Sequence, residues 1–135
     1  MDTNVLVSAL RSNKGASFKF LSLVDADRFS LCVSVPLVLE YEAALKKQAR
    51  SIGLTLADVD AIIDYICHVA EHYKVYYLWR PFLRDPRDDM VLELAVSSSA
   101  RAIVTYNKTD FKGTEQFGVK TISPKDFLNE IGELR

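Results

Sequence analysis

Four acidic side chains have the chemistry of a divalent-cation site, although they lie far apart along the chain. Asp2 opens an Asp-Thr-Asn sequence that precedes an apolar run, and Glu40, Asp88 and Asp110 each lie at the edge of an expected helix or strand. Carboxylate oxygens are preferred ligands of hard cations such as Mg²⁺. A fold that brought the four together would build such a site, so the question becomes which elements position them.

Composition indicates one globular domain. The chain has 135 residues, of which 49% are apolar and 26% charged, enough for a single ordinary core. A net charge of −1 argues against a histone-like protein that coats nucleic acid, but it leaves room for a nucleic-acid enzyme rich in metal-binding carboxylates. The sequence shows neither a signal-peptide pattern nor an apolar run of membrane-spanning length, so we expect a soluble, cytoplasmic protein with no membrane partner.

Hydrophobic periodicity alternates between the helical and the strand pattern along the chain, which is typical of a parallel sheet covered by helices. We therefore predict an α/β fold: a doubly wound, mostly parallel sheet of four to five strands with helices on both faces, in a single domain over residues 1–135. The expected helices lie near residues 18–24, 35–47, 56–71, 86–100 and 124–130, and the expected strands at 29–33, 75–79, 102–105 and 119–122.

The predicted topology gathers the polar candidates at one edge. Ligands of such sheets bind beyond the carboxyl ends of the strands. Asp2, Thr105, Asn107 and Asp110 are expected at strand ends, and the two remaining acids lie early in helices that follow strands. The start of the chain is the difficulty, because only Met1 precedes Asp2. Either residues 5–9 form the first strand, which would put Asp2 at its wrong end, or the delivering strand is missing from this sequence.

Four segments in order resemble the PIN-domain nucleases, and most closely the stand-alone prokaryotic ones similar to toxins of toxin–antitoxin pairs. The first segment is residues 2–10, and the second is Val38-Leu39-Glu40-Tyr41. Arg80-Pro81 with residues 85–95 forms the third, and residues 104–111 form the fourth. Each segment alone is a weak signal, but the ordered combination is specific and spans most of the chain.

The resemblance implies an endoribonuclease that depends on Mg²⁺ or Mn²⁺, forms a homodimer and is held inactive by a small antitoxin protein. By motif, it places Asp2, Glu40 and Asp88 at the acidic positions. The fourth position is Asn107 here, with Asp110 three residues on, so either could fill that role. The expected catalytic set is Asp2, Glu40, Asp88, Asn107 and Asp110, and its four acids are the expected metal ligands. Thr3, Asn4 and Thr105 are expected to orient the carboxylates, and Arg11, Lys14, Arg84, Arg87 and Lys108 to contact RNA phosphates.

Simpler interpretations stay open for each residue. Asp88 could be only a helix-capping acid after Asp85-Pro86, Glu40 could pair with a lysine on a solvated face, and Asp110 could be a turn residue.

Two other functions compete with the nuclease. One is a catalytically decayed PIN-like module that binds RNA or protein, which Asn107 and the apparently missing first strand favour. The other is a phospho-enzyme with an aspartate nucleophile, which the lack of a second acid two residues after Asp2 disfavours.

Overall fold

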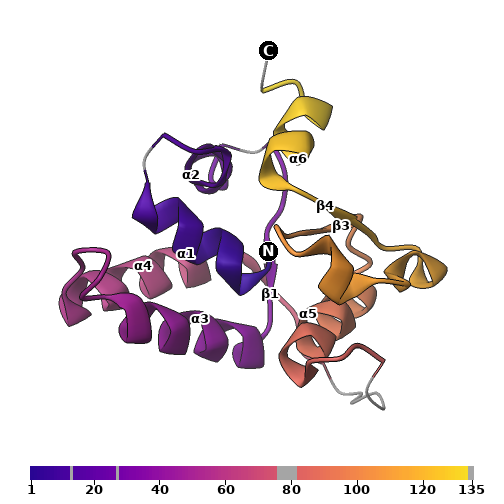
Figure 1. Ribbon diagram of the computed structural model, residues 1–135, viewed down its shortest axis with the longest axis horizontal. Coiled ribbons are helices and arrows are strands. Elements are labelled where there is room, and N and C mark those ends of the chain that lie inside the picture. The colour runs from indigo at the N-terminus through magenta and orange to yellow at the C-terminus, as the bar shows by residue number, and fades with distance from the viewer. Residues whose placement is uncertain (13, 27, 76–81, 134–135) are drawn as a thin grey trace.

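The computed structural model describes residues 1–12, 14–26, 28–75 and 82–133. Helices predominate in these ranges, and the strands are short (Figure 1). No helix within them is both long and apolar enough to cross a bilayer. In chain order the elements are α1 (Thr3–Arg11), α2 (Ala16–Ser22), β1 (Cys32–Val33), α3 (Val35–Gln48), α4 (Leu56–Val69), β2 (Glu71–His72), α5 (Pro86–Ser97), β3 (Ala102–Val104), the 3₁₀ turns η1 (Lys108–Phe111) and η2 (Thr114–Phe117), β4 (Lys120–Ile122) and α6 (Pro124–Glu130).

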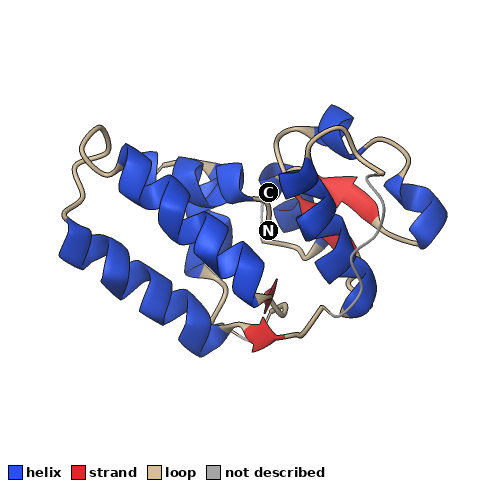
Figure 2. Cartoon of the chain, turned by 90° about the horizontal axis from the view of Figure 1, so that it is seen from below, coloured by secondary structure: helices blue, strands red, loops and turns tan. Residues whose placement is uncertain are grey.

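The strands pair in parallel, as the alternating pattern predicts, which confirms the α/β class. They form two small sheets in the described part of the chain rather than one continuous sheet. β1 pairs with β2, and β3 pairs with β4. Figure 2 shows the two pairs of strands as separate groups among the helices.

Three helices begin where a capping residue and a nearby proline predict. Ser34, Asp85 and Ser123 are the N-caps of α3, α5 and α6, and the side chain of each accepts a hydrogen bond from a backbone amide in the first helical turn. A proline follows within the first two positions, where its missing N–H leaves no helical bond unmade. Glu40 and Asp88 are thereby fixed early in α3 and α5.

Two expectations are corrected. Residues 5–9 are helical, because Asp2 caps α1 by accepting the Thr3 amide, and the apolar side chains of α1 bury one helical face. The helix expected over 56–71 ends at Val69, and its last residues turn extended to form β2 beside β1. Most of the strand expected at 75–79 lies outside the described residues, and residue 75 itself belongs to no strand.

The core joins the N-terminal helices to the C-terminal half. α1 packs on α2 and α3, α3 packs on α4, and α2 packs on α6. The Tyr41 side chain of α3 is fully buried in this core. Phe20 stacks on Phe29 with ring centroids 4.8 Å apart, and Phe127 of α6 meets both rings edge-on at 5.4 and 5.0 Å. These three rings hold α6 against α2 and against the segment that precedes β1.

Candidate active site

Asp2 is held at the end of β3 by hydrogen bonds to its backbone and to both carboxylate oxygens. Its amide donates to the Val104 carbonyl at 2.8 Å. The Oδ1 atom accepts the Thr3 amide at 2.8 Å, and Oδ2 accepts the Thr105 hydroxyl at 2.6 Å. Only 8% of Asp2 is exposed. A carboxylate so buried and so fully bonded is fixed in position before any ligand arrives.

Thr105 couples Asp2 to the loop that follows β3. It is fully buried, and its hydroxyl oxygen also accepts the Asn107 amide at 3.0 Å. Asn107 is the residue just before η1, and its carbonyl accepts the Asp110 amide at 3.0 Å. Two segments more than 100 residues apart in sequence therefore meet through one hydroxyl group.

One cleft of about 600 Å³ collects the predicted polar residues. Its walls come from α1, α3, the start of α5 and the loop leading into η1. Thr3 and Asn4 also line it, whereas Thr105 lies behind Asp2. The lining includes Asp2, Glu40, Asp88, Asn107 and Asp110.

Asp88 shows that the acids are close enough to repel one another. The pKa of Asp88 is raised to about 7, first by burial and then by the negative charges of Asp2, Asp85 and Asp110, against the opposing effect of Arg87. An acid in this setting is stabilised by a cation or a proton. The neighbouring Asp89 instead holds the preceding loop, because its Oδ1 atom accepts the backbone amides of residues 82 and 83 at 3.2 and 2.8 Å.

The donor set fits a hard divalent cation held in part by water and substrate. Within the described ranges, no three acidic, histidine or cysteine side chains converge into a ready-made metal site. Mg²⁺ does not need one, because it keeps several waters and commonly binds one or two carboxylates together with phosphate oxygens. The Asn4 Oδ1 atom is buried in the cleft wall and has no hydrogen-bond partner among these residues, which leaves an oxygen acceptor free for a cation or its water.

Basic groups lie on the same walls. Arg11 and Arg87 line the cleft, Arg11 contacting Gln48 and Arg87 pairing with Asp85 at 3.0 Å. The structure does not place Lys14, Arg84 or Lys108 in the lining, and the Lys108 ammonium lies 3.8 Å from Asp126.

Sequence reasoning missed two charged residues of the cleft, Lys47 and Asp85. Lys47 lines it because it lies seven residues, or two helical turns, after Glu40 on the same face of α3. The seven-residue spacing from Glu40 could have identified Lys47 as a cleft residue from the sequence. Asp85 reaches the cleft as the N-cap of α5, and its negative charge acts on Asp88.

The comparisons with known proteins agree with this arrangement. The family model of the PIN domain matches residues 1–109, which include every candidate acid but Asp110. The chain belongs to the PIN-domain family. PIN domains are a family of nucleases that generally depend on metal ions. Neither the curated proteins nor the solved structures yield a match to this PIN domain.

Proposed function

We propose that this PIN domain is an endoribonuclease that hydrolyses RNA phosphodiesters with Mg²⁺ or Mn²⁺. The observation that carries the proposal is the single cleft, which gathers Asp2, Glu40 and Asp88 from three different helices or caps and adds Asn107 and Asp110 from the loop after β3. Burial, and after it the negative charges of neighbouring acids, raise the pKa of Asp88. A bound cation would relieve the repulsion among these acids, which supports the proposal.

Roles follow from burial and bonding. Asp2 and Asp88 are assigned to hold the metal, Asp2 because hydrogen bonds already fix its carboxylate and Asp88 because it is partly buried beside the negative charges of other acids. A metal held by these two carboxylates would lower the pKa of a bound water and would offset the negative charge that develops on the leaving oxygen. Glu40 and either Asn107 or Asp110 orient the attacking water from the other walls.

The basic residues define where the RNA backbone would lie. Arg11 of α1, Lys47 of α3 and Arg87 of α5 line the acidic cleft. Phosphates bound by Arg11 and Lys47 would be steered toward the acids, and affinity should fall with salt as counterions are released.

Cleavage of a mixed RNA pool tests the assignment. The native protein should cut with Mg²⁺ or Mn²⁺ and stop in EDTA, and Asp88→Asn should lower the rate at least 100-fold. Asp64→Asn is the matched control, because Asp64 is an exposed residue of α4 outside the cleft lining. Equal rates for the native protein and Asp88→Asn would contradict the site.

The chief competing function is a decayed module that binds RNA without cutting it. Asn107, at a position where the family resemblance leads us to expect an acid, favours this alternative. RNA retention by the native protein with no metal-dependent cleavage would establish that alternative.

The biological role we propose is that of a toxin controlled by a small antitoxin protein. The resemblance of the four sequence segments to stand-alone prokaryotic PIN proteins supports this role, as it supports a homodimer. Expression in a bacterial host should arrest growth, Asp88→Asn should not, and scattering during gel filtration gives the oligomeric state. Equal arrest by the native protein and the variant would contradict a toxin that acts through this cleft.

A further inference from the structure

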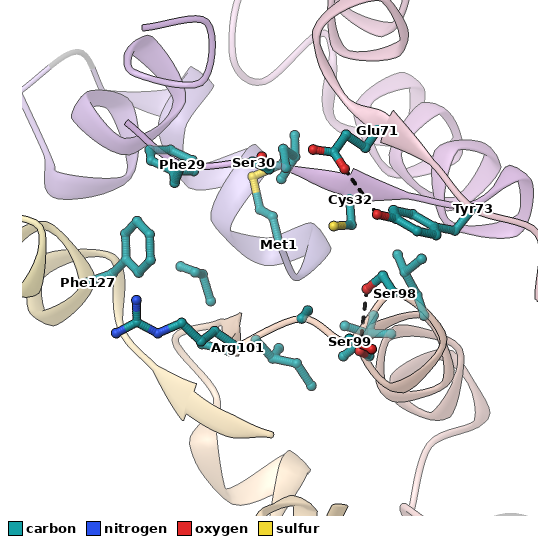
Figure 3. A pocket seen from close by; sticks show the side chains of 18 of the residues that line it. Met1, Phe29, Ser30, Cys32, Glu71, Tyr73, Ser98, Ser99, Arg101 and Phe127 are labelled. Carbon is teal, nitrogen blue, oxygen red and sulfur yellow. Dashed lines mark hydrogen bonds between the residues drawn. The ribbon is translucent and has the colours of Figure 1, made fainter. Parts of the chain in front are cut away.

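The acidic cleft and the cavity between the two small sheets differ in whether their basic side chains are neutralised. The cavity has a volume of about 400 Å³, is lined by residues of β1 and β3 and is largely apolar (Figure 3). Its two arginines form ion pairs, Arg28 with Glu133 and Arg101 with Glu130. In the acidic cleft, Arg11 and Lys47 form no ion pair within the described residues. The cleft therefore presents positive charge that no acid of these residues neutralises.

Two neighbouring helices form the long walls of the cleft. α1 and α3 pack side by side (Figure 1). Near the start of α1, the Tyr41 hydroxyl of α3 donates to the Met1 carbonyl. At the other end, the Arg11 guanidinium donates to the side-chain oxygen of Gln48, the last residue of α3. The two helices therefore run in the same direction along the cleft.

Charge is separated along these walls. On α3, Lys47 lies seven residues after Glu40, and on α1, Arg11 lies nine residues after Asp2. At 1.5 Å per residue, each cation lies about 10 to 14 Å from the acid along its helix. The lining between the two ends is small and uncharged and consists of Val7, Ser8, Ala43 and Ala44. The cleft thus has an acidic end and a basic end with a neutral floor between them.

Lys47 differs from its neighbour Lys46 in what it faces. Lys46 pairs with Glu42 at 3.4 Å and lies outside the cleft lining, whereas Lys47 lines the cleft. Both lie in the last turn of α3, where the helix dipole favours a cation. The dipole therefore explains a cation in this turn but not one that faces the cleft. Arg11 is held by a neutral amide, so its charge is likewise left for an anion.

The cleft has room for one strand of nucleic acid. Its volume of about 600 Å³ lies within the range of pockets that enclose small ligands. A duplex does not fit, because one of its grooves alone is about 12 Å wide. Phosphates of one strand follow every 3.4 Å along a stacked helix and lie further apart in an extended strand, so a length of about 10 to 14 Å corresponds to roughly two to four nucleotides.

We propose that the Arg11 and Lys47 end of the cleft is a second phosphate subsite, which holds a phosphate of single-stranded RNA roughly two to four nucleotides from the phosphate that is cut. The subsite presupposes the proposed nuclease function, and it specifies the substrate as a single strand long enough to reach both ends of the cleft. A shorter strand leaves one end empty, and a duplex does not enter.

Binding tests the subsite without cleavage. In an Asp88→Asn background with Mg²⁺, fluorescence anisotropy measures the Kd of a labelled single-stranded octanucleotide as salt is varied. Arg11→Gln combined with Lys47→Gln should reduce the slope of log Kd against log salt by about 0.7, the value for one phosphate of a single strand. That slope corresponds to an affinity loss of about eightfold at 50 mM salt and about threefold at 200 mM. Lys46→Gln combined with Arg50→Gln removes the same charge from exposed positions outside the cleft lining and should change neither quantity.

Neutral linkages in the strand locate the phosphate. In the native protein, one uncharged methylphosphonate linkage should lower kcat/KM most at a single position roughly two to four nucleotides from the mapped cut. The Arg11→Gln and Lys47→Gln protein should be insensitive to the same replacement, because the cations that bind this phosphate are already gone. Equal kcat/KM for the strand and for its duplex would overturn the proposal.

The salt slopes separate the subsite from the nuclease. Equal slopes for the two double variants would overturn the subsite even where the native protein cuts RNA. A slope change confined to the Arg11→Gln and Lys47→Gln protein would support the subsite even where no RNA is cut. Lys47→Gln alone leaves the hydrogen bond between Arg11 and Gln48 in place and should still lower affinity about threefold at 50 mM salt, so the test does not depend on that bond.

Discussion

Replacement of Thr105 by valine tests whether one hydroxyl positions the acid that opens the chain. The substitution keeps the shape of a fully buried side chain but removes the 2.6 Å bond to the Asp2 carboxylate and the 3.0 Å acceptor for the Asn107 amide. A hydrogen bond to a charged group contributes about 1.5–3 kcal/mol. We expect Thr105→Val to lower the free energy of unfolding by about 2–3 kcal/mol, because Asp2 is 8% exposed and water reaches it poorly.

Thr114→Val is the matched control for this experiment. Thr114 is equally buried, but its hydroxyl donates to the neutral Val119 carbonyl at 3.1 Å, so its loss should cost only about 1 kcal/mol. Urea denaturation in EDTA gives both values. Titration with Mn²⁺ should show affinity falling about tenfold in Thr105→Val alone, since groups that orient metal ligands contribute roughly 10- to 100-fold. Equal destabilisation by both variants, with unchanged Mn²⁺ affinity, would refute the reasoning.

Three further predictions concern the surroundings of the cleft. The pKa of Asp88 in the folded protein is raised to about 7, so between about pH 4 and pH 7 the folded metal-free protein keeps a proton that the unfolded chain has lost. The free energy of unfolding should therefore fall as the pH rises from about 4 to about 7. Urea midpoints measured across this range should show a smaller fall in Asp88→Asn than in the native protein. Asp89→Ala leaves the amides of residues 82–83 without their acceptor and should destabilise by about 2–3 kcal/mol in the same assay, an effect that a surface residue would not show. Tyr41→Phe removes the bond to the Met1 carbonyl and should lower the free energy of unfolding by about 1 kcal/mol, whereas an unchanged midpoint would mean the bond contributes nothing.

Local signals in the sequence were enough to place α3 and α5, the two helices that carry Glu40 and Asp88. Ser34 with Pro36 and Asp85 with Pro86 mark helix starts through chemistry confined to one turn, and these starts fix Glu40 and Asp88. The family pattern added the order of the acids. That these acids lie in one cleft could be predicted only from the rule that the carboxyl ends of parallel strands lie at one edge of the sheet, where ligands bind.

The start of the chain could not be settled by such local signals. Residues 5–9 are apolar and partly β-branched, which suits a strand, yet capping by Asp2 and burial against α2 and α3 make them helical. β2 was hidden for a similar reason: Glu71 and His72 are polar and exposed, and only pairing with β1 extends them. Lys47 was missed because charged residues on a helix are usually solvated, although its spacing from Glu40 was available.

α3 emerges as the element on which the geometry of the cleft depends most. Successive residues on a helix point about 100° apart. Glu40 therefore faces the cleft while Tyr41 turns inward to hold the backbone just before Asp2, and Lys47 returns to the cleft two turns later. A shift of this helix would move Glu40, the Tyr41 anchor of Met1 next to Asp2, and Lys47 together.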